Sequence, residues 1–370
     1  MITEERTQSI TLNGITYNAQ EIKELNQSVT DEPPVILRDL YAFLDDWYSP
    51  SPTLVVHTSG STGTPKPITV LKEQMIKSAQ LTCDYLQLRK GDTALLCMPL
   101  QYIAGKMMVV RALVAGLNLL IREPSGHPLA HLHSPLRFAA MIPLQVYNSL
   151  QNPAERQALC GIEQLIIGGG AINSTLEEEI KTLPGAVYST YGMTETLSHI
   201  ALRRLNGPNA SSHYQPFEQV KLSLSDQGTL VIDAPSVCAE QLVTNDVARI
   251  FDDGSFTILG RKDNIINTGG IKVQTEWVEE QLRPLIGTDF AITSVPHSQL
   301  GEAVVLLLKH AENINTDSLR TQMDEFLPKY HSPKYILITH SIPQTGSGKI
   351  DRAGCKELAQ RLMEQHCSAT

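Results

Sequence analysis

The sequence predicts a mixed α/β protein: a large N-terminal domain of parallel sheets covered by helices, with a β-rich subdomain, and a small α+β C-terminal domain on a hinge. Three observations support this prediction. Between residues 53 and 190, short apolar strands alternate with segments of helical spacing, which is typical of βαβ units. Near residue 210 the pattern changes to strands separated by Gly-containing turns. From residue 275 onward, helices and strands mix again over roughly 100 residues, a usual domain size.

The first region consists of short apolar runs, most of them followed by a helical segment. The strands that we expect are 53–57, 93–98, 117–121, 138–142, 164–167 and 186–190. The helices that we expect are 37–47, 71–88, 103–115, 144–150 and 175–182. Because the strands are apolar on both faces, they favour a parallel sheet with helices on both sides.

The other two regions have shorter-range patterns. Between 214 and 259, turn sequences such as Asp252-Asp253-Gly254 separate alternating strands and predict hairpins. After 275 we expect a helix to about 285, strands near 291 and at 303–308 and 335–339, and helices at 317–326 and at the end. The domains that we expect are therefore 1–262, with its β-rich part at 210–262, and 263–370, a small C-terminal domain.

Composition excludes several classes of protein. The net charge of −9 argues against nucleic acid as a partner and against general binding to an anionic membrane. The most apolar stretch, Met107 to Ile121, is interrupted by Arg111 and Asn118, so no integral membrane span is expected. The chain starts with polar and acidic residues, and its six cysteines lack zinc-site spacing. These features predict a reduced, cytoplasmic protein in which any phosphate is held by local loops.

A loop rich in glycine and hydroxyl groups follows the first expected strand. It is Thr58-Ser59-Gly60-Ser61-Thr62-Gly63-Thr64-Pro65-Lys66. Backbone amides at glycines, hydroxyl donors and a mobile lysine suit a triphosphate. The loop is not a Walker motif, because Pro65 stands where that motif has glycine before its lysine. The alternative is a surface linker, which is uncommon directly after a buried strand.

Two further motifs also follow strands. In the segment 188–196, Glu195 among hydroxyl residues suits Mg²⁺, a hard cation that shares oxygen ligands with phosphates. Taken alone, Glu195 is more often a helix-start carboxylate, and Tyr191 is more often a core residue. The segment Gly168-Gly169-Gly170-Ala171 permits a flat ligand to approach the backbone, although a tight strand-to-helix turn explains it equally well.

Two motifs lie near the expected C-terminal domain. Gly260-Arg261-Lys262-Asp263, followed by 267–272, stands where β-rich sequence gives way to the last module, as a hinge would. The segment 344–351 is a glycine-rich arm with one lysine, Lys349. An exposed loop is the alternative for the second.

Together and in this order, the five motifs resemble those of the acyl-adenylate-forming superfamily, over most of the chain from about residue 54. A closer resemblance, to the o-succinylbenzoate–CoA ligases of menaquinone biosynthesis, comes from the segments 98–105 and 191–203. The resemblance implies an AMP-forming acid–thiol ligase with ATP, Mg²⁺ and coenzyme A, which adenylates a small-molecule carboxylic acid and transfers the acyl group to the thiol.

The resemblance also implies roles for individual residues. Lys349, Lys66 and Arg261 would be catalytic, Glu195 with Thr194 would hold the metal, and Asp263 would be the hinge. The thiol tunnel would be bordered by Gly269, Gly270 and Lys272. The residues implied in ATP binding are Thr58, Ser59, Gly60, Ser61, Thr62, Gly63, Lys66, Gly169, Gly170, Ala171, Tyr191, Gly192, Thr194, Asp246, Arg261 and Lys349.

For the acid, the pocket must hold an aromatic ring and a second carboxylate, which a cation or imidazolium would pair with. The candidates are Tyr102, Lys106, Ser198, His199 and Arg203. Arg203 could instead be a solvated arginine beside Arg204, and His199 a hydrogen-bonded core residue.

The chain departs from the family pattern at Pro67, Asn245 and Tyr102, and its phosphate loop begins near residue 58 rather than well past 100. The resemblance therefore implies that much of the usual N-terminal subdomain is missing or reduced, and we expect a homodimer partner to cover the face that this subdomain normally hides. Two alternatives stay open: a ligase for another aryl, fatty or amino acid, and a non-catalytic nucleotide-binding protein.

Overall fold

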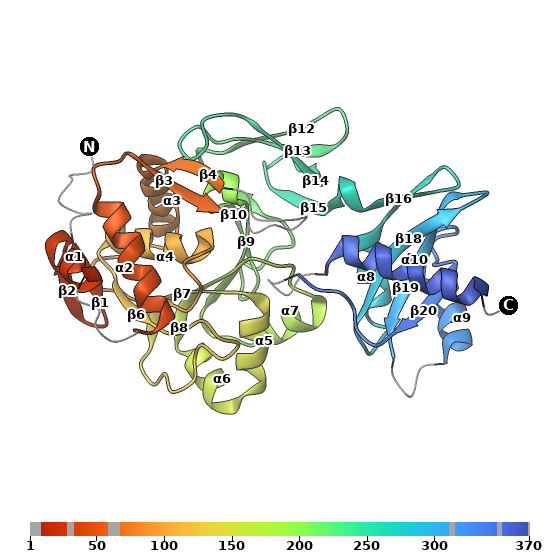
Figure 1. The fold of residues 1–370 in the computed structure, drawn as a ribbon, viewed down its shortest axis with the longest axis horizontal. Helices are drawn as coiled ribbons and strands as arrows, with labels where there is room; N and C mark the ends of the chain where they lie inside the picture. Colours follow the sequence, from red (N-terminus) through yellow and green to blue (C-terminus); the bar gives the residue numbers. More distant parts are fainter. Residues whose placement is uncertain (1–8, 28–32, 58–66, 311–314, 346–349, 369–370) are drawn as a thin grey trace.

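The computed structural model describes residues 9–27, 33–57, 67–310, 315–345 and 350–368. Figure 1 shows a larger lobe that contains the N-terminal two thirds of the chain and a smaller lobe that contains the rest. The larger lobe has one continuous buried core, and the smaller lobe has two separate core clusters that begin at Ile266.

The larger lobe is built on a nine-stranded sheet in the order β11-β10-β9-β8-β7-β5-β6-β1-β2. The strands β9, β8, β7, β5, β6 and β1 run parallel, and antiparallel strands close both edges. The bounds of the strands are β1 (Ser9–Leu12), β2 (Ile15–Asn18), β5 (Thr93–Leu96), β6 (Asn118–Ile121), β7 (Leu136–Met141), β8 (Ile162–Ile167), β9 (Ala186–Gly192), β10 (His199–Arg204) and β11 (Gln215–Pro216).

Helices cover this sheet because each connection between its parallel strands must cross over a face. α3 packs on α4, and α5 packs on α6 and α7. From Met107 to Val114 every residue of α4 is buried, as expected of a helix enclosed on all sides. The bounds are α1 (Ala19–Gln27), α2 (Val35–Tyr48), α3 (Lys72–Tyr85), α4 (Ile103–Ala115), α5 (Pro143–Gln151), α6 (Pro153–Cys160) and α7 (Ser174–Ile180).

The strand expected at 53–57 has a different environment from the one that we predicted. β3 (Thr53–His57) pairs antiparallel with β4 (Pro67–Leu71) in a separate two-stranded sheet. In β3 only Leu54 and Val56 are buried, so the strand has one core face and one exposed face. A five-residue apolar run does not distinguish this half-buried hairpin strand from a strand buried in a parallel sheet.

A four-stranded antiparallel sheet follows, as the turn sequences predicted. Its order is β12-β13-β14-β15, and the turns at Gly228 and Gly254 have positive φ angles that favour glycine. The bounds are β12 (Lys221–Leu224), β13 (Thr229–Asp233), β14 (Leu242–Ile250) and β15 (Phe256–Arg261).

The smaller lobe is a five-stranded sheet with helices on both faces. Alternate residues of β19 face opposite clusters, one beneath α8 and α9 and the other beneath α10. The bounds are β16 (Ile265–Thr268), β17 (Ile271–Gln274), β18 (Phe290–His297), β19 (Gly301–Lys309), β20 (Tyr335–Thr339), α8 (Thr275–Leu282), α9 (Thr316–Phe326) and α10 (Arg352–Ser368). The predicted fold class, parallel α/β followed by a separate α+β region, is confirmed.

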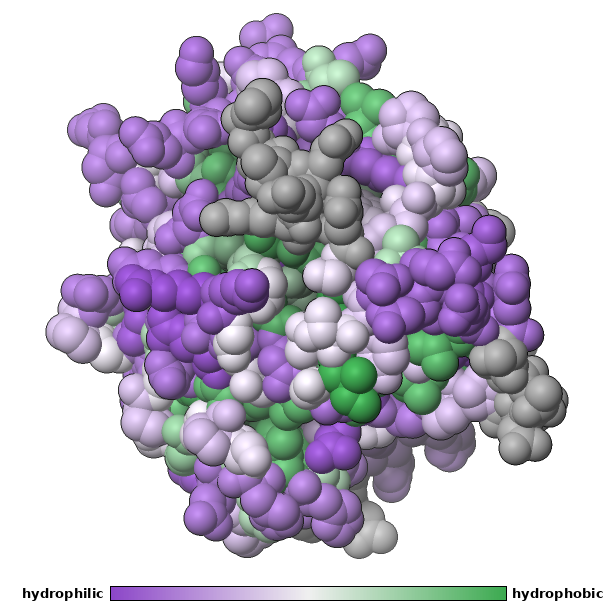
Figure 2. All heavy atoms as spheres, turned by 90° about the vertical axis from the view of Figure 1, so that its left-hand side faces the viewer, coloured by the Kyte–Doolittle hydropathy of each residue, from purple (hydrophilic) through white to green (hydrophobic). Residues whose placement is uncertain are grey.

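At the N-terminal end, β1 and β2 form a hairpin that extends the sheet beyond β6 through the pairing of Thr11 with Asn118. Figure 2 views this end of the molecule and shows apolar side chains between hydrophilic flanks. Within the described residues, no helix is both long and apolar enough to cross a membrane.

Candidate functional site

Two of the predicted motifs meet at one edge of the large sheet. β8 and β9 are parallel neighbours, with Ile167 opposite Ser189, so the loops that follow them leave the sheet side by side. The glycine segment 168–170 follows β8. The second motif starts with the last two residues of β9, Tyr191 and Gly192, and continues to Thr196. Ligands of parallel sheets bind at this carboxyl edge of the strands.

The glycines at this edge are required by close packing. A Cβ atom on Gly168 would lie 2.5 Å from Thr190 Oγ1, and one on Gly192 would lie 2.3 Å from the carbonyl oxygen of Ser198. Gly169 has a φ angle of +79°, in the region that favours glycine. A side chain at either position would collide with these neighbours, so the two loops are held close to the strands beside them.

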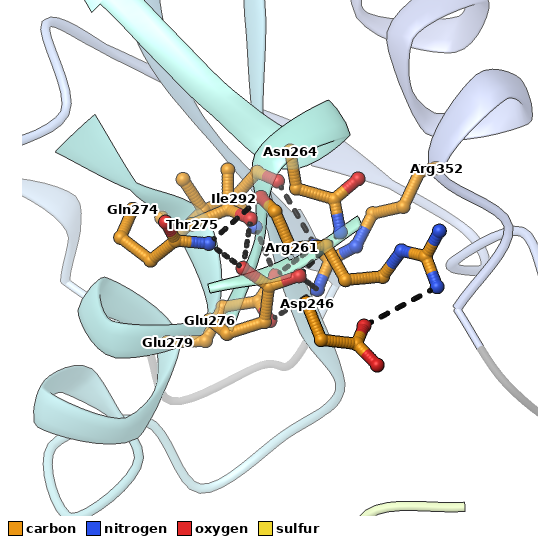
Figure 3. Close-up of polar contacts among 9 residues, drawn as sticks. All are labelled: Asp246, Arg261, Asn264, Gln274, Thr275, Glu276, Glu279, Ile292 and Arg352. Atoms are coloured by element: carbon orange, nitrogen blue, oxygen red, sulfur yellow. Dashed lines mark hydrogen bonds and ion pairs between the residues drawn. The ribbon is translucent and has the colours of Figure 1, made fainter. Parts of the chain in front are cut away.

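A chain of polar contacts links β9 to the β-rich sheet. The hydroxyl of Tyr191 donates to Asp246 Oδ2 at 2.6 Å, and Arg261 lies 3.5 Å from Asp246 Oδ1. Arg261 also pairs with Asp263 at 3.1 Å, and Asn245 donates to the same carboxylate at 3.0 Å. Figure 3 shows Asp246 and Arg261 pointing toward each other beside the smaller lobe. The predicted ribose, catalytic and hinge residues therefore form one network.

The residues predicted to hold a metal are present in suitable form. Thr194 and Glu195 lie in the short helix η2 (Thr194–Thr196), where Thr194 is buried and Glu195 is exposed. No cluster of three or more His, Cys, Asp or Glu residues that could hold a metal occurs among the described residues. One exposed carboxylate fits Mg²⁺, which is usually bound by one or two carboxylates, substrate phosphates and water.

Other predicted residues lie apart from this network or outside the described residues. The phosphate loop, Thr58 to Lys66, and Lys349 are outside the described residues. Gly269 and Gly270 form the two-residue turn between β16 and β17, both with positive φ angles, and Lys272 is exposed on β17. Ala171 is exposed after the glycine segment.

A second buried cluster lies where β10 begins. His199 is buried, with Nε2 at 3.1 Å from Thr82 Oγ1 of α3 and Nδ1 at 3.2 Å from Ser198 Oγ. Burial and the charge of Arg111 hold the pKa of His199 well below its ordinary value. Its imidazole is therefore neutral near pH 7, and it is not the imidazolium that we considered for pairing with a carboxylate. The residue before this pair, Leu197, has a φ angle of +64°, a strained backbone conformation for leucine.

Arg111 completes this cluster, and the sequence analysis did not include it among the site residues. Its guanidinium donates to Ser198 Oγ at 2.5 Å and lies 3.7 Å from Met108 Sδ. The residue is only 2% exposed, its Nε atom is buried without a hydrogen-bond partner, and no ion pair joins it to a described carboxylate. Burial lowers the pKa of Arg111 to about 10, so it stays charged at pH 7. The sequence carried one signal for Arg111, because this charged residue interrupts the most apolar run of the chain, Met107 to Ile121.

The other acid-pocket candidates have different surroundings. Arg203 forms a two-pronged ion pair with Glu177 of α7, at 2.9 and 2.8 Å. Lys106 faces Phe43 of α2, and burial lowers its pKa. Tyr102 is half-buried just before α4, and its backbone forms an isolated parallel β-bridge with His57. The structure therefore brings Ser198 and His199 together with Arg111, and it places the other three candidates in separate contacts.

Comparisons with known proteins agree with this architecture. A probable 2-succinylbenzoate–CoA ligase of Mycobacterium tuberculosis is 26% identical over 329 residues, which cover 81% of this chain and 82% of that protein. The acyl-CoA synthetase (AMP-forming)/AMP-acid ligase II-like protein of Dyadobacter fermentans is 33% identical, with a TM-score of 0.61 and coverage of 92% and 97%. Escherichia coli MenE, solved with a bound analogue of OSB-AMS, shares the fold at 18% identity, a TM-score of 0.73 and 97% coverage of both chains.

The family described as AMP-binding enzyme matches residues 7–237, more than half of the chain. This match covers the large sheet, the glycine loops at its carboxyl edge and the cluster around Arg111. The chain therefore belongs to the AMP-binding enzyme family.

Proposed function

We propose that this enzyme is an ATP-dependent acid–CoA ligase that converts o-succinylbenzoate to o-succinylbenzoyl-CoA in menaquinone biosynthesis. The observation that carries the proposal is the buried guanidinium of Arg111, which has no carboxylate partner among the described residues. A buried charge without a counterion is costly, so such a charge is expected where a ligand supplies the counterion. An acid with two carboxylates offers one to adenylation and leaves the other for Arg111.

The groups around Arg111 suit such a ligand. Ser198 is partly buried and lies against the guanidinium, so a carboxylate that displaces or joins the Ser198 hydroxyl reaches a charge-assisted donor. His199, neutral and bonded to Thr82, holds Ser198 in place through its Nδ1 atom. The name of the Mycobacterium tuberculosis relative, probable 2-succinylbenzoate–CoA ligase, indicates an acid of this kind.

The adenylation step joins two anions, a carboxylate and the α-phosphate of ATP, and expels pyrophosphate. Tyr191 would stack on the adenine, and Asp246 would accept hydrogen bonds from the ribose hydroxyls, with the charge of Arg261 beside them. Thr58 to Lys66 would hold the β- and γ-phosphates, and Lys349 would neutralise charge at the reacting centre. Mg²⁺, bound by Glu195 with Thr194, supplies further neutralisation of the phosphates when it is present.

The second step, attack of the coenzyme A thiol on the acyl carbon with release of AMP, needs different surroundings. We infer that the domain 263–370 rotates about Asp263 and replaces Lys349 with the Gly269–Gly270 turn and Lys272. Asp263 suits a hinge, because it is exposed and its carboxylate makes polar contacts to Arg261 and Asn245, which belong to the network at the lobe boundary.

A panel of carboxylic acids tests the proposal. AMP release with and without coenzyme A would be measured for o-succinylbenzoate, benzoate, a fatty acid and an amino acid. We expect o-succinylbenzoate to give the highest kcat/KM and AMP release to depend on coenzyme A. Preference for another acid would support the alternative ligase, and no ATP–pyrophosphate exchange with any acid would support a non-catalytic nucleotide-binding protein.

We also propose a cytoplasmic homodimer. The five cysteines whose side chains are described are all free thiols, which suits a reducing compartment. Ile15, Val35 and Val55 are more than half exposed, and a second copy of the chain would cover such apolar side chains. Sedimentation velocity is expected to give a dimer, and a monomer at micromolar concentration would contradict this part of the proposal.

A further inference from the structure

Two carboxylates of the smaller lobe fasten one face of α10. Arg352 and Lys356 stand four residues apart and therefore lie on the same face of this helix. Arg352 pairs with Glu279 of α8, and Lys356 pairs with Glu302 of β19. Neither carboxylate belongs to the motifs on which the proposed function depends.

The first of these pairs is partly buried, and the arginine contacts both oxygens of the carboxylate. Arg352 donates to the two oxygens of Glu279 at 2.5 and 2.8 Å, and the side chain of Glu279 is only 7% exposed. The backbone of Ile292 in β18 donates to the same carboxylate at 2.7 Å, and its carbonyl accepts from Arg352 at 3.2 Å. Figure 3 shows Arg352 and Glu279 in this group, between two elements of the lobe. This geometry fixes where α10 begins relative to α8 and β18.

The chain just before α10 is tied on both sides of the segment 345–349. Gln344 and Ile350 form an antiparallel bridge, and the amide of Asp351 donates to the carbonyl oxygen of Pro343 at 2.9 Å. Gln344 and Ile350, which flank the expected adenylation lysine in the sequence, therefore lie side by side. The arginine–glutamate pair begins two residues later and holds this junction against the lobe.

The second pair, Lys356 with Glu302, lies near the Gly269–Gly270 turn, which is the segment expected to act in thioester formation. Glu302 accepts from Lys356 and from Ser294 Oγ, both at 2.8 Å, through one oxygen. Its other oxygen accepts from the backbone amide of Asn267 at 3.3 Å, two residues before the Gly269–Gly270 turn. Burial raises the pKa of Glu302, but the bonds from Lys356 and Ser294 outweigh it and hold that pKa below its ordinary value. The Lys356 side chain is 47% exposed, so this pair is weaker than the first.

We propose that the two carboxylates position the segments used in the two different half-reactions. Glu279, acting through Arg352, positions the junction of Gln344 and Ile350, which flank Lys349 in the sequence, for adenylation. Glu302, acting through Asn267, positions the Gly269–Gly270 turn for thioester formation. Both are positioning residues rather than catalytic residues, and the inference rests on the proposed function because it assigns each carboxylate to one of its steps.

The test measures the two half-reactions separately in three variants. Arg352→Lys keeps the charge and loses the two-pronged geometry, and Glu302→Gln removes the charge at the second segment. Lys309→Met is the matched control, because Lys309 pairs with Asp289 at 2.8 Å in the same lobe, at the end of β19 opposite to Glu302 and the Gly269–Gly270 turn. ATP–pyrophosphate exchange with o-succinylbenzoate reports adenylation, and synthetic o-succinylbenzoyl adenylate with coenzyme A reports thioester formation. Thermal unfolding of each variant is recorded alongside.

We expect Arg352→Lys to lower exchange about tenfold and to change thioester formation less than about twofold. Glu302→Gln is expected to lower thioester formation about threefold and to leave exchange unchanged, and Lys309→Met should change neither.

Equal losses in both half-reactions would overturn the inference, since they would mean that the pairs only stabilise the lobe. If Arg352→Lys does not unfold cooperatively, the Glu302→Gln result decides by the same criterion. A wild-type protein inactive with every acid would overturn the proposed function and this inference together, whereas an active wild type with unseparated effects overturns the inference alone.

Discussion

Two arginines near the ends of β10 have opposite surroundings. Arg203, near its C-terminal end, forms a two-pronged ion pair with Glu177, so its charge has a counterion within the protein. Arg111, which reaches the N-terminal end through Ser198, is fully buried and has a hydroxyl as its strongest partner. The first arginine ties α7 to the sheet, and the second holds a charge that nothing in the described protein neutralises. The comparison teaches that an arginine is a ligand-binding candidate when its counterion is missing, rather than when it lies near a motif.

The largest effect is expected at Arg111. Arg111→Met keeps an unbranched apolar side chain in the buried space and removes the unpaired charge. We expect KM for o-succinylbenzoate to rise about 100-fold, roughly 2.7 kcal/mol, while KM for ATP stays within about twofold. Because burying an unpaired charge costs free energy, the unfolding midpoint should stay the same or rise. A lower midpoint with an unchanged KM would mean that Arg111 is structural, and would end the contrast with Arg203.

Arg203→Met is expected to do the reverse. It leaves Glu177 partly buried without its partner, so we expect the free energy of unfolding to fall by about 1–3 kcal/mol. KM for the acid should change less than about twofold, because the side chain serves α7 rather than the ligand. Denaturant unfolding and steady-state kinetics check both parts, and a raised KM with unchanged stability would restore Arg203 as an acid-binding residue.

His199 allows a test by pH. The pKa of His199 is lowered in the folded protein, so the unfolded chain binds the proton more tightly than the folded chain does. The stability that comes from a neutral His199 is therefore fully present above about pH 6.5, and it is lost as the pH falls below that value. We expect wild type to lose about 1 kcal/mol more than His199→Gln between pH 6.5 and 5.5. In the same experiments KM for the acid should be flat from pH 6 to 8, since the cation is Arg111. A rise of KM with an apparent pKa near 6.5 would instead indicate an imidazolium at the acid.

The smallest effect is expected at Lys106. This side chain lies over the ring of Phe43, 5.9 Å from its centroid, on the α2 side of α4 rather than beside Ser198. We predict that Lys106→Met changes KM for the acid less than about threefold and changes stability by less than about 1 kcal/mol. A large rise in KM would show that the acid extends toward α2, and would add a second cation to the pocket.

Much of the fold was predictable, because local patterns determine it. The alternation of strands and helices from 93 to 190 and the glycine turns of the β-rich sheet follow from residue periodicity and from positive φ angles. The hairpin of β1 and β2 was missed, since it joins the sheet only through β6, about a hundred residues away. β3 was assigned to the wrong kind of sheet, because its short apolar run does not reveal a partner.

The site was predictable only in part, for a similar physical reason. The glycine loops and the tyrosine–aspartate–arginine network follow motifs that are contiguous in the sequence. The acid cluster depends on contacts between distant segments: Arg111 meets Ser198 across 87 positions, and Thr82 meets His199 across 117. A charged residue inside an apolar helix indicates that something unusual is buried there, but only the packed structure shows whether a carboxylate has met it.

The most direct test of the central claim compares two acids in wild type and in Arg111→Met. One is o-succinylbenzoate, and the other is 3-benzoylpropionate, the same keto acid without the ring carboxylate. If Arg111 binds the second carboxylate, wild type should prefer o-succinylbenzoate by about 100-fold in kcat/KM, and the variant should show a preference of only a few fold. A variant that keeps the full wild-type preference would contradict the account.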